Sequence, residues 1–177
     1  MKLLPYLLPA LFTCLLSSAL FAQYPDEDED DSDPDEQFLP YVKIQEVKDF
    51  AELLQQARRE KKIIMLEMSA SYCGFCKTLE KYMIKPMLRS GDYTQNVLIR
   101  KLDIDSYYPM QDLSGQPSTP SKIAYKLGVE LTPTLLFLDG RGQEVSERIV
   151  GVNTLELFGG YVDAALEEGH RIMLNNE

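Results

Sequence analysis

The residues of this 177-residue chain that most directly suggest chemistry are two cysteines two residues apart, in the run Cys73-Gly74-Phe75-Cys76. A short apolar run precedes them and a helical pattern follows. A thiol at the N-terminus of a helix meets unpaired backbone N–H groups, whose partial positive charge favours the thiolate. The pair therefore predicts thiol–disulfide exchange, with Cys73 as the outer nucleophile and Cys76 as the inner thiol that resolves a mixed disulfide.

Three other roles for the cysteine pair compete with this interpretation. A structural zinc site needs four ligands, yet without Cys14 of the N-terminal segment the chain keeps these two cysteines and one distant histidine, His170. A purely structural disulfide would gain little, because so short a loop removes little entropy from the unfolded chain. Inert buried thiols would be unusual in an exported protein, so we expect redox chemistry with no metal and no cofactor.

Hydrophobic periodicity predicts the elements that must position the cysteines. The predicted strands are Tyr41–Glu46 (weak), Ile63–Met68, Val97–Asp103, Thr134–Leu138 and Glu144–Val150. The predicted helices are Val47–Lys62, Lys77–Lys85, Ser121–Leu127 and a last one opened by Asn153 and Glu156. This order predicts an α/β fold in which a central mixed sheet is covered by helices on both faces and ends in a β-hairpin and a helix.

Local signals set several boundaries of these elements. Asp49 is placed to cap the first helix, and Pro86 must kink or end the helix that follows the cysteines. The proline-containing segment Ser106–Thr119 is predicted to be an irregular insertion. Asp139-Gly140-Arg141-Gly142 supplies the turn residues of the final hairpin.

The N-terminus has the pattern of a secretory signal peptide, with Lys2 followed by an apolar run from Leu3 to Ala22. Cleavage after Ala19 or Ala22 would remove Cys14. The competing interpretations are a permanent membrane helix, which prolines in the run disfavour, and a lipoprotein acylated at Cys14, whose preceding residues fit that motif loosely. We therefore expect export through the signal peptide to the periplasm.

An acidic run accounts for most of the formal charge of −10, because nine of the eleven residues 26–36 are acidic. Such a run is expected to be a solvated linker, with a cation-binding or docking tail as the alternative. The predicted organisation is therefore a signal peptide (1–22), an acidic linker (23–40) and one folded domain (41–177). The folded part is nearly neutral, and the chain lacks the basic surface that a non-specific nucleic-acid binder needs.

The pairing of Cys73-Gly74-Phe75-Cys76 with Leu131-Thr132-Pro133-Thr134, about sixty residues later, resembles the thioredoxin superfamily across residues 41–168. In that family the proline is cis and packs beside the sulfurs, which would leave the backbone of Thr132 to pair with an extended substrate. The alternative is that Pro133 merely starts an edge strand. The resemblance implies that substrate is bound by Tyr72, Gly74, Phe75, Thr132 and Pro133. Tyr72 replaces the usual tryptophan, and Phe75 replaces the proline of reducing cytosolic thioredoxins.

Two further residues match the family one by one. Glu67, six residues before Cys73, stands where thioredoxin-like proteins carry a buried acid that handles the proton of the inner cysteine. Burial would raise the pKa of that carboxyl toward the range useful for a general base. Lys101 matches a lysine that accompanies the acid. The alternatives are that Glu67 points to solvent and that Lys101 is an ordinary surface charge.

A narrower resemblance, to small periplasmic thioredoxins of the sulfur-oxidation-associated type, rests on Asp112-Leu113-Ser114-Gly115 and on the stretch from Ile123 to Val129. It implies a monomeric oxidoreductase that reduces or exchanges disulfides in exported client proteins and is recharged by a membrane thiol reductant. Oxidation or isomerisation of clients would use the same residues. A redox-sensing or chaperone-like binding module with little catalysis is the alternative from a different class.

Overall fold

The computed structural model describes residues 39–175. The predicted signal peptide and the linker up to residue 38 lie outside the described residues, as do residues 176–177. Within the described part, no helix combines the length and the apolar character needed to cross a membrane.

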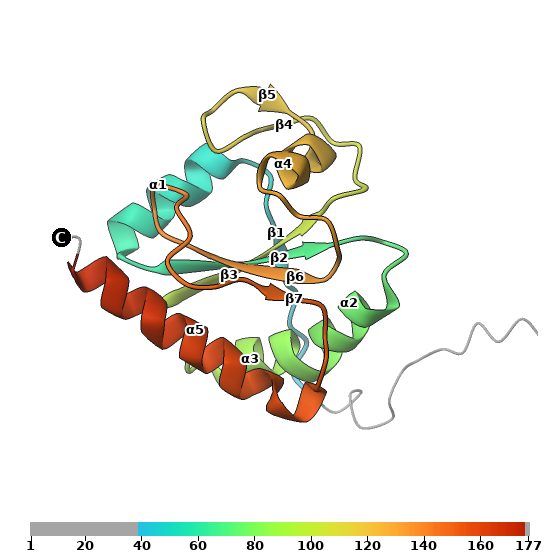
Figure 1. Ribbon diagram of the computed structural model, residues 1–177, viewed down its shortest axis with the longest axis vertical. Coiled ribbons are helices and arrows are strands. Elements are labelled where there is room, and N and C mark those ends of the chain that lie inside the picture. Colours follow the sequence, from blue (N-terminus) through green and yellow to red (C-terminus); the bar gives the residue numbers. More distant parts are fainter. Residues whose placement is uncertain (1–38, 176–177) are drawn as a thin grey trace, which may run out of the picture. The chain divides into compact units, whose positions relative to one another are not determined.

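One mixed sheet forms the centre of the domain, with the strand order β1-β3-β2-β6-β7 (Figure 1). Its strands are β1 (Gln45–Glu46), β2 (Ile63–Ser69), β3 (Val97–Asp103), β6 (Thr134–Leu138) and β7 (Ile149–Val150). The first three strands are parallel, whereas β6 is antiparallel to β2 and β7 is antiparallel to β6. The predicted α/β class with a mixed sheet is confirmed, and β3 and β6 have the predicted bounds.

The central strand β2 is buried on both sides, as its nearly continuous apolar run predicts. Because side chains alternate along a strand, Ile64, Leu66 and Met68 face one layer and Ile63 and Met65 face the other. The first layer holds α1 (Phe50–Glu60) and α4 (Pro120–Lys126), and the second holds α3 (Lys85–Ser90) and α5 (Leu155–Asn175) (Figure 1).

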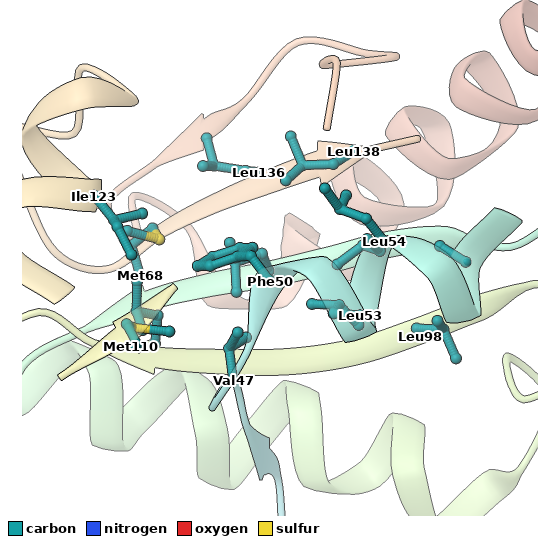
Figure 2. Packing of buried hydrophobic residues seen from close by; sticks show 14 of the residues in the cluster. Val47, Phe50, Leu53, Leu54, Met68, Leu98, Met110, Ile123, Leu136 and Leu138 are labelled. Atoms are coloured by element: carbon teal, nitrogen blue, oxygen red, sulfur yellow. The ribbon is translucent and has the colours of Figure 1, made fainter. Parts of the chain in front are cut away.

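The core beneath α1 shows why this helix forms where it does. Asp49 caps it by accepting hydrogen bonds from the N–H groups of Ala51 at 2.7 Å and Glu52 at 3.2 Å. The helix then directs Phe50 and Leu54 toward the sheet, where Figure 2 shows them among the residues of this cluster. Phe50 is completely buried, and burying such a side chain contributes about 1.5–3 kcal/mol.

The helix after the cysteines continues past Pro86 to Ser90, so the predicted end at Lys85 is wrong. It consists of α2 (Gly74–Leu79), a π-helical turn η2 (Glu80–Ile84) and α3, which begins with Lys85 and Pro86. The N–H of Lys85 donates to the carbonyl of Glu80, five residues earlier. A proline has no N–H to donate and crowds the preceding turn, and the wider π turn in front of it lets the chain remain helical.

The insertion within Ser106–Thr119 is more regular than predicted. It contains a small antiparallel pair of strands, β4 (Met110–Gln111) and β5 (Pro117–Ser118). The buried Asp112 carboxylate fixes its turn, because it accepts from the N–H groups of Ser114 and Gln116 and from Lys126 Nζ at 2.6 Å. A two-residue strand is too short for periodicity to reveal.

The predicted edge strands are shorter in the structure. Tyr41–Glu46 forms a ladder only at Gln45 and Glu46, and Glu144–Val150 only at Ile149 and Val150. A single isolated bridge joins Glu144 to Leu138. Both segments lie at the outside of the sheet with one neighbour each, so propensity alone does not hold their remaining residues in a ladder.

Candidate active site

The two cysteines lie where the central strand passes into a helix, and they form a disulfide with a Cα–Cα distance of 5.3 Å. Cys73 is the N-cap of α2, and its Sγ accepts a hydrogen bond from the N–H of Cys76 at 3.1 Å. Cys73 is 8% exposed and Cys76 is 1% exposed. Cys73 is therefore the outer sulfur and Cys76 the inner one.

The loop that carries Cys73 is tied to the end of β3. The N–H of Ile104 donates to the carbonyl of Ser69 at 2.8 Å, and the N–H of Ser71 donates to the carboxylate of Asp105 at 3.1 and 3.2 Å. The hydroxyl of Ser71 also donates a hydrogen bond to this carboxylate. The hydrogen bonds from Ser71 lower the pKa of Asp105, so this clamp persists at neutral pH. Sequence reasoning missed both residues.

Pro133 lies at the same edge of the sheet as the cysteines. Thr134, which starts β6, is opposite Met68 near the end of β2. The Thr132–Pro133 peptide bond is cis, and the carbonyl of Pro133 accepts from the N–H of Gly151 at 2.8 Å. Because β6 lies between β2 and β7, the alternative in which Pro133 starts an edge strand is wrong.

The backbone of Thr132 makes no hydrogen bond to any residue between 39 and 175. Its neighbours on either side are engaged, since Leu131 accepts from the hydroxyl of Thr134 at 2.8 Å and Pro133 accepts as described above. The N–H and the carbonyl of Thr132 thus remain available at the edge that carries the disulfide.

Glu67 points into the layer of α2, α3 and α5 and is completely buried, so the solvent-facing alternative is wrong. Neither carboxyl oxygen has a hydrogen-bond partner among residues 39–175. Burial raises the pKa of Glu67 to about 9, with further contributions from the negative charges of Glu80 and Asp103, while Lys101 acts in the opposite direction. The carboxyl is therefore protonated at neutral pH.

Lys101 lies beside Glu67 on the neighbouring parallel strand and is partly buried rather than an ordinary surface charge. Its Nζ is 3.2 Å from Glu80 Oε1 and 3.6 Å from Asp103 Oδ2. Burial alone would lower the pKa of Lys101, but the two carboxylates outweigh burial and raise it. Glu80 is a member of this group that sequence reasoning missed, because its position depends on the π turn.

The surface around the disulfide is open and apolar. Tyr72 is 78% exposed and Phe75 is 66% exposed, and a Cβ added at Gly74 would meet no atom within 4 Å. Leu131, next to Thr132, is also exposed and was not among the predicted residues. In the described part of the chain, no three side chains of the metal-binding types come together.

Comparisons with known proteins agree with this geometry. A family model described as a thioredoxin-like domain matches residues 50–166. The thiol:disulfide interchange protein DsbD of Tatumella citrea is 30% identical over 117 residues, which are 66% of this chain but 18% of that protein. A thioredoxin H-type of Chlamydomonas reinhardtii is 32% identical over 79 residues, covering 44% of this chain and 66% of that protein.

Solved structures share the fold. The thioredoxin of Malassezia sympodialis has a TM-score of 0.51 at 20% identity, covering 75% of this chain and 95% of that one. The thioredoxin of Fasciola hepatica has a TM-score of 0.50 at 18% identity, covering 71% and 99%. These two likenesses concern the fold alone.

Proposed function

Because the chain belongs to the thioredoxin-like family, we propose that it is a thiol–disulfide oxidoreductase that transfers electrons from Cys73 and Cys76 to disulfides in client proteins. The observation that carries this proposal is the placement of the Cys73 sulfur. It caps a helix, it is the more exposed of the two sulfurs, and it accepts the N–H of Cys76. The same N–H stabilises a thiolate once the disulfide is reduced.

In the first step the Cys73 thiolate attacks one sulfur of a client disulfide. A bond forms between Cys73 Sγ and that sulfur, the client S–S bond breaks, and the second client sulfur leaves as a thiolate that takes a proton from water. The product is a mixed disulfide. Cys76, buried beneath Cys73, stays reduced during this step.

In the second step Cys76 resolves the mixed disulfide. Its thiolate attacks Cys73 Sγ, the bond to the client breaks, and the client leaves with both of its sulfurs reduced. Two electrons have passed from the cysteine pair to the client, and the Cys73–Cys76 disulfide remains. A dithiol reductant must then regenerate the pair.

Glu67 is proposed to accept the proton of Cys76 during resolution. Its pKa of about 9 lies close to that of an ordinary thiol, so the proton moves between them with little change in free energy. Only the ionised carboxyl accepts a proton, and that fraction is small at pH 7 and rises toward pH 9. Lys101 acts indirectly, because its positive charge favours the ionised form of Glu67.

The client chain is proposed to bind beside Cys73 as an extended strand. The unpaired N–H and carbonyl of Thr132 offer the hydrogen bonds for strand addition, and Pro133 follows directly at the active-site edge. Tyr72, Gly74 and Phe75 provide the exposed surface against which the client packs.

The setting of this activity is part of the same proposal. The apolar run that ends at Ala22 supports export by a signal peptide, with residues 23–40 as linker and 41–177 as the folded domain. We propose a monomer in the periplasm that draws electrons from a membrane thiol reductant. The matched proteins named DsbD are thiol:disulfide interchange proteins, and the chain spans 18% of the first of them. The narrower likeness to sulfur-oxidation-associated thioredoxins stays a prediction.

Reduction of insulin disulfides in the presence of dithiothreitol tests the proposal. We expect the intact protein to accelerate precipitation of the insulin B chain, while Cys73→Ser does not exceed the uncatalysed rate. Equal rates for the two proteins would contradict an oxidoreductase and favour a redox-sensing binding module. Equilibration of the cysteine pair with glutathione then measures its reduction potential and shows whether the protein reduces or oxidises its clients. A potential near the oxidising end of the family range, about −120 mV, would indicate a client oxidase.

A further inference from the structure

Two adjacent tyrosines project from the loop between β3 and β4. Tyr107 is 97% exposed and Tyr108 is 82% exposed. They follow Asp105, whose carboxylate is bonded to Ser71 in the active-site loop. Since Ser71 directly precedes Tyr72, this clamp brings the two tyrosines to the same edge of the sheet as the disulfide. Exposed aromatic side chains gathered in one region are typical of a protein–protein contact.

A cavity of about 400 Å³ opens beside Tyr108. It lies at the edge of β3 beyond the end of β1, because β1 pairs only with Arg100 and Lys101 and leaves the last two residues of β3 without a partner strand on that side. The insertion covers this gap. The apolar residues that line the cavity are Val47, Leu102, Tyr108, Pro109, Met110 and Pro120.

The charged residues around the cavity balance one another. Glu46 and Asp103 contribute two negative charges, and Lys48 and Lys101 contribute two positive charges. Two of these four charges are already paired, because Lys101 Nζ is 3.6 Å from Asp103 Oδ2 and also 3.2 Å from Glu80 Oε1. The cavity therefore has no net charge with which to select an ion, and its apolar lining suits an uncharged aliphatic or aromatic group.

We propose that this cavity is a second client-binding subsite, in which Tyr107 and Tyr108 are specificity-determining residues. The occupant is an apolar side chain of the client, a few residues from the cysteine that reacts with Cys73. The client segment passes from the disulfide over Tyr72 and Tyr107 and places that side chain in the cavity beside Tyr108. This subsite rests on the proposed function and names the class of client that it favours.

The subsite is continuous with the active-site edge through one short path. Ser71 lies in the loop that carries Cys73, Asp105 is bonded to Ser71, and Ser106 and Tyr108 line the cavity. In the proposed complex, a segment anchored at the disulfide follows this path to the tyrosines. Tyrosine supplies a large contact area at little cost in side-chain entropy, which is why it dominates many binding surfaces.

The test compares two cystine peptides that differ only at one position a few residues from each cysteine, which is Phe in one peptide and Ser in the other. We expect Tyr108→Ser to lower kcat/KM for the Phe peptide about fivefold to tenfold, mainly by raising KM, as is usual for a residue of a binding hot spot. Reduction of the Ser peptide and of hydroxyethyl disulfide should be unchanged. Tyr108→Phe should retain the preference. Tyr41→Ser, equally exposed but before β1 at the opposite end of the parallel strands, is the matched control.

A binding measurement separates this subsite from the chemistry. The methyl resonance of Met110 is followed while the oxidised protein is titrated with the Phe peptide in which Ser replaces both cysteines. We expect a saturable shift of this resonance that Tyr108→Ser weakens and that the corresponding Ser peptide does not produce. A shift without turnover would overturn the proposed function and keep the subsite. Turnover with equal preference in the intact protein and Tyr108→Ser, or no shift of Met110, would overturn the subsite.

Discussion

The two sides of strand β2 carry different residues over the same length. Ile64, Leu66 and Met68 face α1 and α4, whereas the opposite side carries Ile63 and Met65 and then Glu67, whose carboxyl oxygens are buried without a hydrogen-bond partner among residues 39–175. Both sides are equally inaccessible to solvent. The side that faces α1 and α4 is apolar throughout, whereas the side that faces α3 and α5 gives up stability at Glu67, where it buries a protonated acid.

The largest expected effect is on the apolar side, at Phe50. Phe50→Ala should lower the free energy of unfolding by about 3–5 kcal/mol, because a completely buried aromatic ring is replaced by a cavity. The rate of disulfide reduction per folded molecule should change less than twofold. Urea unfolding measures the first quantity, and insulin reduction well below the unfolding midpoint measures the second. A large loss of activity in the folded Phe50→Ala protein would contradict the claim that this side of β2 serves stability alone.

Glu67→Gln should raise the free energy of unfolding at pH 7, in contrast to Phe50→Ala. The pKa of Glu67 rises on folding from 4.5 to about 9, so between these values the folded protein keeps a proton that the unfolded chain releases. Stability therefore falls as the pH rises through this window, by about 3 kcal/mol between pH 4.5 and pH 7 if the whole shift applies. Glu67→Gln should remove this slope and be the more stable protein at pH 7, while resolving mixed disulfides more slowly.

Urea unfolding at several pH values checks the linkage at Glu67. Glu130→Gln, at an exposed loop position, is the matched control and should leave the slope unchanged. Parallel pH profiles for the intact protein and Glu67→Gln would contradict the assignment of the raised pKa to this carboxyl.

Gly169 sharpens the comparison within α5, which covers the side of Glu67. A Cβ at Gly169 would lie 2.8 Å from Ile63 Cδ1 and 2.9 Å from Val145 Cγ2, so a larger residue would force these two buried side chains to shift. Gly169→Ala should destabilise the fold by about 1–3 kcal/mol. Gly160→Ala, where a Cβ meets nothing within 4 Å, should instead stabilise it by about 0.5–1 kcal/mol. Thermal unfolding of both variants measures these stability changes. Equal changes for the two variants would contradict the close approach at Gly169.

The smallest expected effect is at Lys101. Its positive charge lowers the pKa of Glu67, so Lys101→Met should raise that pKa further and reduce the ionised fraction at pH 7. The rate of mixed-disulfide resolution should fall about twofold to fivefold at pH 7, a modest change typical of one partly screened charge, and recover at higher pH. Stopped-flow measurement of resolution from pH 6 to pH 10 checks this. An unchanged profile would remove Lys101 from the proton-transfer group.

Much of the fold is predictable from the sequence because its signals are local. The apolar runs Val97–Asp103 and Thr134–Leu138 mark the strands with the observed bounds, and Asp49 marks the start of α1. The spacing of Cys73 and Cys76 likewise places one sulfur at a helix start. These signals need only neighbours along the chain.

The features that escape prediction depend on contacts between distant segments. The π turn before Pro86 has no sequence pattern of its own, and it is this turn that brings Glu80 to Lys101. The clamp between Ser71 and Asp105 joins residues 34 positions apart. Burial of Glu67 depends on the helices that cover both faces of β2, and these come from distant parts of the chain.

Trapping of the mixed disulfide tests the central claim most directly. The reduced Cys76→Ala variant is mixed with a cystine peptide, and the adduct is located by mass spectrometry over time. The division into an outer nucleophile and an inner resolving thiol predicts a persistent adduct on Cys73. The same adduct should vanish from the intact protein, and Cys73→Ala should react at Cys76 at least about a hundredfold more slowly, because thiol–disulfide exchange depends on access to the attacking sulfur. Equal reaction at Cys76, or an adduct that persists equally in the intact protein, would contradict the mechanism.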